Sequence, residues 1–467
     1  MKKLKSLLGD IRFWIVLFFF IRLIGITQPP LEVAHNWRQT TVTMVARNFY
    51  ETDANPFYPR IDIVGEKSGI TGMEFPLLNY LIYLASLLFG YDHWYGRLIN
   101  LMVSSAGIWF FYMLGKKYFG KQTAFNAALI LLSSLWFMYS RKIMPDTFSV
   151  SLVLAGLYFG VSYLEKDRKF QFLIGFFVLI TAGLLSKFPS VMILSVIPLI
   201  VFSKKYSCFS RRNFFIALIL GMLPSFFWYF YWAPYLVQMY GFHHFFMGKG
   251  WLEGLSEISL KLPETGMMFV ETSIKYFGFA AFLAGIISAI IKKQRLLLMI
   301  FGLSSTAVIL YILKSGDNFP RHSYYMIPYI PVMALVAGYA LNLIRNKVLL
   351  IAVLSLIVAE GLLNQQHDFR IREIDKPIVE LGNLLDNFSK ETDLILINSG
   401  EYPTPMYFAH RKGWVSSNSN VGDTSFINSL RPLGLRYILI LKRSFGTNQI
   451  LEYECLYDSE NFSIYKP

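Results

Sequence analysis

The sequence is poor in charged residues and in cysteine. Only 16% of its 467 residues are charged, whereas an ordinary soluble domain carries about 25%. The two cysteines, Cys208 and Cys455, lie too far apart in the chain to indicate a disulfide framework or a cysteine metal site. The N-terminal basic segment runs into an apolar stretch with no small-residue cleavage site, so we expect no cleavable signal peptide.

Apolar residues dominate instead, at 54% hydrophobic and 17% aromatic content. Uninterrupted apolar runs of about 16 to 20 residues recur along the chain, which is the length of a bilayer-spanning helix. We expect crossings at residues 11–28, 97–114, 122–139, 147–164, 170–185, 188–203, 213–232, 272–291, 296–313, 324–344 and 347–363. The predicted fold class is a polytopic α-helical membrane protein with about eleven transmembrane helices.

Lysine and arginine residues are concentrated in every second connection between these runs. Short cytoplasmic loops collect Lys and Arg, so this pattern predicts a cytoplasmic N-terminus and an extracytoplasmic C-terminus. It also explains the net charge of +14 without a nucleic-acid partner. The alternation requires that the apolar piece Phe75–Gly90 does not cross. Its helix would be about 24 Å long, shorter than the roughly 30 Å hydrocarbon core, so we expect it to lie in the outer interface.

A large polar loop, residues 29–97, follows the first apolar run. Most connections between elements are short, so we interpret this loop as the extracytoplasmic active-site loop of a transmembrane domain at residues 1–363. Residues 364–467 are mostly polar and predict a small extracytoplasmic α/β domain, with strands near 393–398, 436–442 and 462–465 and a helix within 378–388. This tail contains no Gly-rich phosphate-binding turn, HExxH or GxSxG motif that would indicate chemistry.

A membrane enzyme without a nucleotide motif can take a lipid-borne activated group from the bilayer. Such a site needs a carboxylate to activate an acceptor and cations to bind a lipid phosphate. Near the outer ends of the runs the carboxylates are Glu32, Glu74 and Asp146, and the cations are Arg38, Arg141, Lys142, Lys187 and Arg321.

Each of these residues also has a plainer interpretation. Glu32 and Glu74 could be solvated loop carboxylates, and Asp146 could cap a helix that begins at the following residue. Arg38 could form a cation–π contact with its neighbour Trp37. A metal requirement stays open as well, because His243 and His244, with a carboxylate such as Glu74, could bind a divalent ion.

Short motifs spread over nearly the whole chain resemble a known family. They are His35-Asn-Trp-Arg-Gln39, Met44–Phe49, Glu74-Phe-Pro-Leu77, Gly96-Arg-Leu98, Pro145-Asp146, Lys187-Phe-Pro189, His322–Pro328 and His410–Trp414. In this order they resemble the GT-C glycosyltransferases, within the dolichyl-phosphate-mannose–protein mannosyltransferase-like group, family 39.

The resemblance implies a multi-pass inner-membrane enzyme that moves a sugar from a polyprenyl-phosphate donor to a glycan, lipid or protein acceptor on the extracytoplasmic side, with inversion. It implies substrate-binding roles for His35, Arg38, Gln39, Lys187, Arg321 and His322. Family members usually carry an acidic residue just after the position of Gln39. Here residues 40–43 read Thr-Thr-Val-Thr. The expected base is therefore Glu74, followed by Glu32 and Asp146.

Two other classes of function compete with this interpretation. A flippase or other transporter of lipid-linked glycans would also bind a polyprenyl lipid, but many transporter folds show internal repeats with broken helices in corresponding halves. We find no such repeat in the sequence. A structural or receptor role is disfavoured by the polar content of the first loop. Membrane lipids are expected partners in every case.

Overall fold

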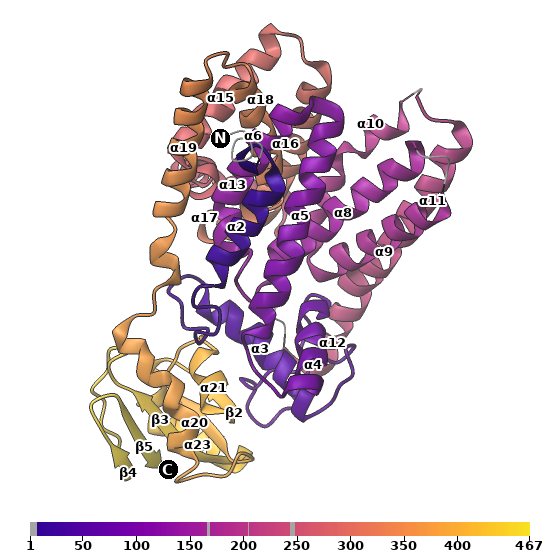
Figure 1. Cartoon of the computed structure of the whole chain (residues 1–467). Helices are drawn as coiled ribbons and strands as arrows, with labels where there is room; N and C mark the ends of the chain where they lie inside the picture. The colour runs from indigo at the N-terminus through magenta and orange to yellow at the C-terminus, as the bar shows by residue number, and fades with distance from the viewer. Residues whose placement is uncertain (1–6, 166–168, 204, 243–247) are drawn as a thin grey trace. The chain divides into compact units, whose positions relative to one another are not determined.

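The computed structural model describes residues 7–165, 169–203, 205–242 and 248–467 (Figure 1). The chain divides into two compact units. The helical unit comprises Met1–Ile26, Arg97–Tyr231 and Phe246–Gln366. The loop–tail unit comprises Thr27–Gly96, Trp232–Phe245 and His367–Pro467. The first polar loop and the C-terminal tail, which are far apart in sequence, thus fold together.

The helical unit confirms the predicted fold class, because each apolar run is helical over most of its length. Its α-helices are α2 (Ile11–Leu23), α5 (Tyr95–Phe119), α6 (Lys121–Ser133), α7 (Leu135–Tyr139), α8 (Pro145–Glu165), α9 (Phe170–Ser186), α10 (Ile197–Val201), α11 (Cys208–Phe227), α13 (Trp251–Ser259), α14 (Leu262–Met267), α15 (Lys275–Ile291), α16 (Arg295–Ser315), α17 (Asn318–Arg321), α18 (Ile330–Asn342) and α19 (Lys347–Leu363). Tighter or wider turns form η1 (Phe188–Val196), η2 (Trp228–Trp232), η3 (Met268–Ile274) and η4 (Ser323–Met326).

Six helices in the described part of the chain are long and apolar enough to cross a membrane by length and composition. They span Tyr95–Phe119, Pro145–Glu165, Cys208–Tyr240, Leu262–Ile291, Arg295–Ser315 and Lys347–Phe369. Shorter apolar helices include Phe170–Ser186, Phe188–Val201 and Ile330–Asn342. The number of crossings therefore stays a prediction.

Two boundaries differ from the expected ones for local reasons. The run at 122–139 is interrupted at Ser134, whose hydroxyl accepts a hydrogen bond from the Trp136 amide at 3.2 Å and so starts a new helix. Helix α8 begins at Pro145, a residue that suits the first helical position because it has no amide hydrogen to leave unpaired. Asp146 therefore lies inside the first turn, and its interpretation as a cap before a helix starting at Thr147 is wrong.

Helix α8 is the most buried of these six long apolar helices, and it packs closely against α9. The close approach depends on Gly183, because a Cβ there would lie 2.7 Å from the Val153 side chain and 3.0 Å from the Ser149 carbonyl oxygen. This packing fixes the end of α8 that carries Asp146.

The loop–tail unit combines helices from the first loop with the sheet of the tail. It contains α3 (Asn36–Glu51), α4 (Leu77–Phe89) and α12 (Ala233–Tyr240), followed by the short helical segments η6 (Glu373–Glu380), α20 (Leu381–Leu385), α21 (Thr404–Ala409), α22 (Asn418–Val421), α23 (Thr424–Leu430) and η7 (Arg431–Leu433). The strands are β1 (Leu394–Ile397), β2 (Lys412–Val415), β3 (Leu435–Leu441), β4 (Glu454–Asp458) and β5 (Phe462–Lys466), in the order β2-β1-β3-β5-β4. β1 runs parallel to β2 and β3, and β5 runs antiparallel to β3 and β4.

One apolar core joins the loop to the tail. Met44, Val45 and Phe49 of α3 pack in the same buried cluster as Ile395 of β1 and Leu439 of β3. Fully burying a side chain of this size contributes about 1.5–3 kcal/mol. The sheet therefore stabilises helix α3.

Helix α4 is amphipathic. Its buried face includes Asn79, whose amide donates to the Val42 carbonyl of α3 at 2.9 Å. Leu84 on its other side and the last three residues, Leu87, Leu88 and Phe89, are exposed. This pattern is typical of a helix lying in a membrane interface, and the interfacial position stays a prediction.

The predicted topology can be tested with single cysteines in a variant that lacks the two free native thiols, Cys208 and Cys455. Lys116 and Ser256 are both exposed, so Lys116→Cys and Ser256→Cys should not disturb packing. We expect a membrane-impermeant thiol reagent to label residue 256 but not residue 116 in intact cells. Labelling at residue 116 with protection at residue 256 would show that the predicted topology is inverted.

Candidate active site

Glu74 and Arg38 form a buried ion pair in the loop–tail unit. Arg38 Nη2 bonds to Glu74 Oε1, and the two residues are only 4% and 3% exposed. Arg38 lies in the first turn of α3, and Glu74 lies just before α4. Taking two charges out of water costs several kcal/mol per ion, so burial requires such a partner. The interpretation of Glu74 as a solvated loop carboxylate is therefore wrong.

Glu32 is also buried, and its carboxylate is held by Gln39, the residue that follows Arg38 in α3. Gln39 Nε2 donates to Glu32 Oε2 at 3.0 Å. The Glu32 backbone forms an isolated antiparallel bridge with Ile371 of the tail. His35 precedes α3 with a φ of 60°, an uncommon conformation for a residue with a side chain, and it turns the chain into the helix. The N-terminal turn of α3 thus holds one carboxylate through Arg38 and another through Gln39.

Residues 40–43, where the resemblance led us to look for an acid, are three threonines and one valine, and all four are buried. The Thr40 hydroxyl donates to helix carbonyls and lies 3.0 Å from the Thr404 hydroxyl of the tail. The Thr41 and Thr43 hydroxyls also donate to carbonyls of α3. Threonine hydroxyls commonly satisfy themselves in this way. Residues 40–43 are therefore packing positions in this protein.

In the helical unit, Asp146 and Lys187 line one narrow cleft. The cleft has a volume of about 10 Å³ and is also lined by Ser149, Val150, Pro189, Ser190, Tyr311, Tyr324, Tyr325 and Pro328. Lys187 Nζ lies 5.6 Å from the centre of the Tyr324 ring, a cation–π contact. The Ser149 and Ser190 hydroxyls both donate to the Lys187 carbonyl, at 3.1 and 2.8 Å, and fix its backbone.

Arg321 and His322 do not line this cleft. Arg321 pairs with Asp317 at 2.7 Å, and its side chain is largely exposed. His322 Nδ1 lies 2.8 Å from the Asn318 carbonyl oxygen, and its ring packs near Tyr324 and Tyr325. The structure therefore brings His322, but not Arg321, to the aromatic wall beside Lys187.

The metal candidates remain without structural support. His243 and His244 lie outside the described residues. Within the described ranges, no group of three or more His, Cys, Asp and Glu side chains is arranged to hold a metal ion.

A larger apolar cavity of about 330 Å³ lies deeper in the helical unit. It falls within the usual range for small-molecule pockets, about 300–1,000 Å³. Helices α5, α8, α10, α16 and α18 and segment η1 line it, mainly through Phe, Leu, Ile and Val side chains. Lys205 and Tyr206 are among its few polar lining residues.

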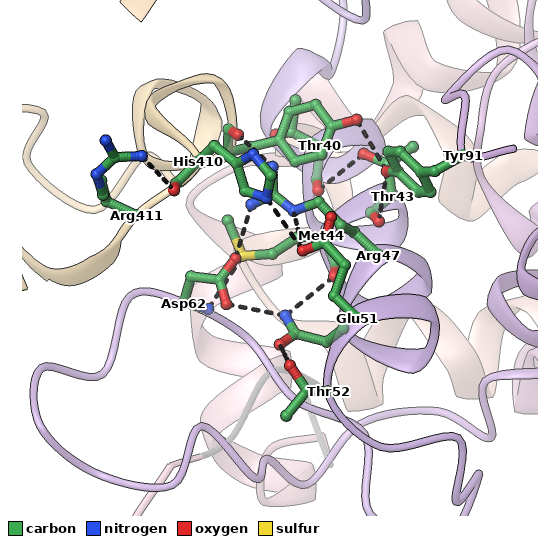
Figure 2. Close-up of polar contacts among 12 residues, drawn as sticks. Thr40, Thr43, Met44, Arg47, Glu51, Thr52, Asp62, Tyr91, His410 and Arg411 are labelled. Atoms are coloured by element: carbon green, nitrogen blue, oxygen red, sulfur yellow. Dashed lines mark hydrogen bonds and ion pairs between the residues drawn. The ribbon is translucent and has the colours of Figure 1, made fainter. Parts of the chain in front are cut away.

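Helix α3 also carries Arg47, the centre of a polar network that the sequence did not indicate (Figure 2). Arg47 donates to Asp62 at 3.0 Å and to the Tyr407 carbonyl at 2.8 Å. Burial lowers the pKa of Arg47, but Asp62 and the neighbouring groups raise it more, so the guanidinium stays charged. The Tyr91 and Tyr407 hydroxyls lie 2.9 Å apart, and burial raises the pKa of both, so both are neutral. These partners come from three distant segments, and no local pattern signals them.

Comparison with known proteins identifies the class of fold. The family model described as dolichyl-phosphate-mannose-protein mannosyltransferase matches residues 74–232. ArnT from Cupriavidus metallidurans in the apo state is similar over 97% of both chains, with 13% identity and a TM-score of 0.62. The same protein bound to undecaprenyl phosphate gives a TM-score of 0.61, again with 13% identity and 97% of both chains covered.

Another similar structure is the oligosaccharyltransferase AglB from Archaeoglobus fulgidus, in complex with an inhibitory peptide and a dolichol-phosphate. The similarity covers 92% of this chain and 69% of the AglB chain, with 12% identity and a TM-score of 0.52. No curated protein sequence matches this chain. The chain therefore has the fold of the GT-C glycosyltransferases, and the resemblance that its motifs predicted is confirmed.

Proposed function

We propose that this protein is an integral-membrane glycosyltransferase that moves a sugar from a polyprenyl-phosphate donor to an acceptor on the extracytoplasmic side. One observation carries the assignment of the donor: the polar cleft and the apolar cavity lie along the same helices. Helix α8 contributes Asp146 and Ser149 to the cleft, then Leu154, Leu157 and Val161 to the cavity. At 1.5 Å per residue, Leu157 lies about 16 Å along the helix from Asp146.

The other segments that line the cleft also continue into the lining of the cavity. Segment η1 lines the cleft with Pro189 and Ser190 and the cavity with Ile193 and Val196. Helix α16 lines the cleft with Tyr311 and the cavity with Ser304, Ile300 and Leu296. Pro328 lines the cleft, and α18 contributes Pro331, Val332 and Leu335 to the cavity. A polar cleft that contains Lys187 and several hydroxyl groups, next to an apolar cavity, matches a lipid with an anionic head and a long apolar tail.

The similar proteins support this class of donor. One ArnT structure holds undecaprenyl phosphate, and the AglB structure holds a dolichol-phosphate. Both molecules are polyprenyl phosphates. The cleft as it stands has room for about one water molecule, so a donor phosphate requires side chains such as Lys187 and Tyr325 to move aside.

The proposed chemistry assigns one role to each group. Glu74, oriented by Arg38, takes the proton of the acceptor hydroxyl as general base. The acceptor oxygen forms a bond to the anomeric carbon, while the bond from that carbon to the phosphate oxygen breaks. Lys187 stabilises the negative charge on the leaving polyprenyl phosphate.

The remaining predicted residues take supporting roles in this proposal. Glu32, held by Gln39, is the second candidate base. His35 and His322 contact substrate, Asp146 orients Lys187, and Arg321 binds a more distant part of the substrate. The sugar is a hexose or a pentose, and the acceptor is a glycan, a lipid or a protein. We place the enzyme in the cell inner membrane with a cytoplasmic N-terminus.

Donor binding provides the test. Lys187→Ala should weaken binding of a polyprenyl phosphate, because a hydrogen bond to a charged group contributes roughly 1.5–3 kcal/mol, about 10- to 150-fold in affinity. Leu157→Trp should fill part of the cavity and weaken binding of a long-chain polyprenyl phosphate more than that of a short-chain one. Titration of the purified variants in detergent with both lipids measures these effects.

Lys116→Ala is the matched control, since it removes an exposed cation from α5 that lines neither pocket. Its affinity for both lipids should equal that of the parent protein. If Lys187→Ala and Leu157→Trp also bind both lipids as tightly as the parent, the donor site is placed wrongly.

A further inference from the structure

The short tail helix α21 lies against the helix that holds both candidate bases. Its first residue, Thr404, is buried and donates to Asn36 Oδ1 at 3.2 Å. The same hydroxyl lies 3.0 Å from the Thr40 hydroxyl. Asn36 and Thr40 flank Arg38 and Gln39 in the first turns of α3. Thr404 thus contacts α3 on both sides of the residues that bind Glu74 and Glu32.

The other half of α21 contacts α3 near its C-terminal end. The Tyr407 carbonyl accepts from Arg47, whose guanidinium carbon lies 4.8 Å from the centre of the Tyr407 ring. The Tyr407 hydroxyl lies beside that of Tyr91, which in turn donates to the Thr43 carbonyl of α3 at 3.0 Å. In Figure 2, Thr40, Thr43 and Arg47 lie along this face of α3. One tail helix therefore contacts α3 at two places, nearly two turns apart.

The tail also holds the segments on either side of α3. The Val33 amide donates to the Arg370 carbonyl at 2.9 Å, which fixes the chain at Glu32. The Gly413 amide of β2 donates to the Asp62 carbonyl at 2.9 Å, and Asp62 pairs with Arg47. The tail therefore restrains the loop before the helix, along the helix and after it.

These contacts differ in what they supply. The apolar cluster of Met44, Phe49, Ile395 and Leu439 drives the docking of the tail on α3, because burial of large apolar side chains is the main stabilising contribution. The Thr404 hydroxyl adds little to the stability of the docked tail, because the net contribution of one hydrogen bond is small. The bond is directional, however, and it acts at the turn that carries Arg38 and Gln39.

We propose that the C-terminal tail is a positioning element for the catalytic loop, and that Thr404 is its positioning residue. The Thr404 hydroxyl sets the rotation of the first turn of α3 through Asn36 and Thr40. That rotation sets where Arg38 holds the Glu74 carboxylate relative to the acceptor hydroxyl. A misplacement of about 1 Å at a catalytic group can cost about 10²-fold in rate. The proposal rests on the proposed catalytic function of Glu74.

The test compares Thr404→Val, which keeps the shape but removes the hydroxyl, with Thr404→Ser, which keeps the hydroxyl. Thr404→Val should lower kcat by about 10- to 100-fold, while the Kd for polyprenyl phosphate and the Tm stay near their parental values. Thr404→Ser should restore most of kcat. Thr447→Val, which removes a tail hydroxyl that accepts only from the nearby Gln449 amide, is the matched control and should behave like the parent.

Hydrogen exchange gives a readout that does not require activity. Thr404→Val should raise amide exchange in the first two turns of α3 by about 10-fold, because a lost bond of about 1.4 kcal/mol changes a local opening equilibrium tenfold. Parental exchange there would overturn the proposal, as would parental kcat in Thr404→Val or a kcat that Thr404→Ser does not restore. A Kd that rises, or a Tm that falls, in step with the loss of kcat would also overturn it. A parent protein that shows no turnover would instead count against the proposed function, and exchange alone would then decide the positioning role.

Discussion

Replacement of Glu74 by glutamine is expected to lower turnover by about 10²–10⁴-fold, the usual cost of removing a general base. Glutamine keeps the size of the side chain and can still accept a hydrogen bond from Arg38, but it cannot take a proton. Donor binding should change little, because the proposed sites for the donor's phosphate and for its lipid chain lie in the helical unit, at Lys187 and along α8. The measurement is single-turnover sugar transfer beside donor titration of the same preparation.

Two controls make the result specific. Glu66→Gln changes an exposed carboxylate in the same loop and should keep the parental rate. Because Glu74→Gln leaves Arg38 buried without its countercharge, Glu74→Asp, which keeps the charge on a shorter side chain, is measured in parallel. Glu32→Gln is the next variant. Near-parental rates in Glu74→Gln, Glu32→Gln and their double variant would show that neither carboxylate is the base.

The second large effect concerns stability. Arg38→Ala is expected to destabilise the loop–tail unit by about 3–5 kcal/mol, because it removes the buried guanidinium that pairs with the buried Glu74 carboxylate. Replacing both residues, as Arg38→Met with Glu74→Leu, should cost clearly less than the sum of the two single changes, since no buried charge is left behind. Weaker donor binding in Arg38→Ala, with unchanged donor binding in Glu74→Gln, would show that the Arg38 cation itself contacts the donor.

The comparison is a double-mutant cycle followed by thermal unfolding of the purified protein. The Arg60–Asp53 pair at 2.7 Å is a control from the same loop, and its side chains are 18% and 41% exposed, so the pair is more solvated than Arg38–Glu74. Ion pairs in contact with solvent contribute about 0–1 kcal/mol, so Arg60→Ala should change the Tm much less than Arg38→Ala. An Arg38→Ala variant as stable as Arg60→Ala would show that Arg38 and Glu74 are not a buried pair in solution.

The helices and the stronger strands followed from the sequence, because long apolar runs and β-branched runs dominate their local structure. The runs at 393–398 and 436–442 correspond to β1 and β3. Strands β2 and β4 were missed, since β2 has four residues and contains Gly413, and β4 is largely exposed. A Cβ at position 413 would lie 1.8 Å from the Ile395 carbonyl oxygen, so glycine is required there by a neighbouring strand that local sequence does not reveal.

The site was predicted as a set of residue types but not as an arrangement. The sequence indicated Glu74 and Arg38 as base and phosphate ligand, yet their mutual pairing depends on where α4 packs against α3. The same applies to Arg47, Asp62 and Tyr407, which meet only after the tail has folded onto the loop. Motif order predicted the GT-C fold, whereas side-chain partners depend on tertiary contacts between distant segments.

The most direct test of the central claim is to follow the fate of the lipid carrier. Purified protein, reconstituted with labelled polyprenyl-phosphate sugars and an extract of membrane and envelope acceptors, is assayed for free polyprenyl phosphate and for label on an acceptor. The proposed function predicts that both products accumulate together with the parent protein and that both are lost with Glu74→Gln. Sugar that stays attached to its lipid while the lipid moves between leaflets would contradict glycosyl transfer and indicate a flippase.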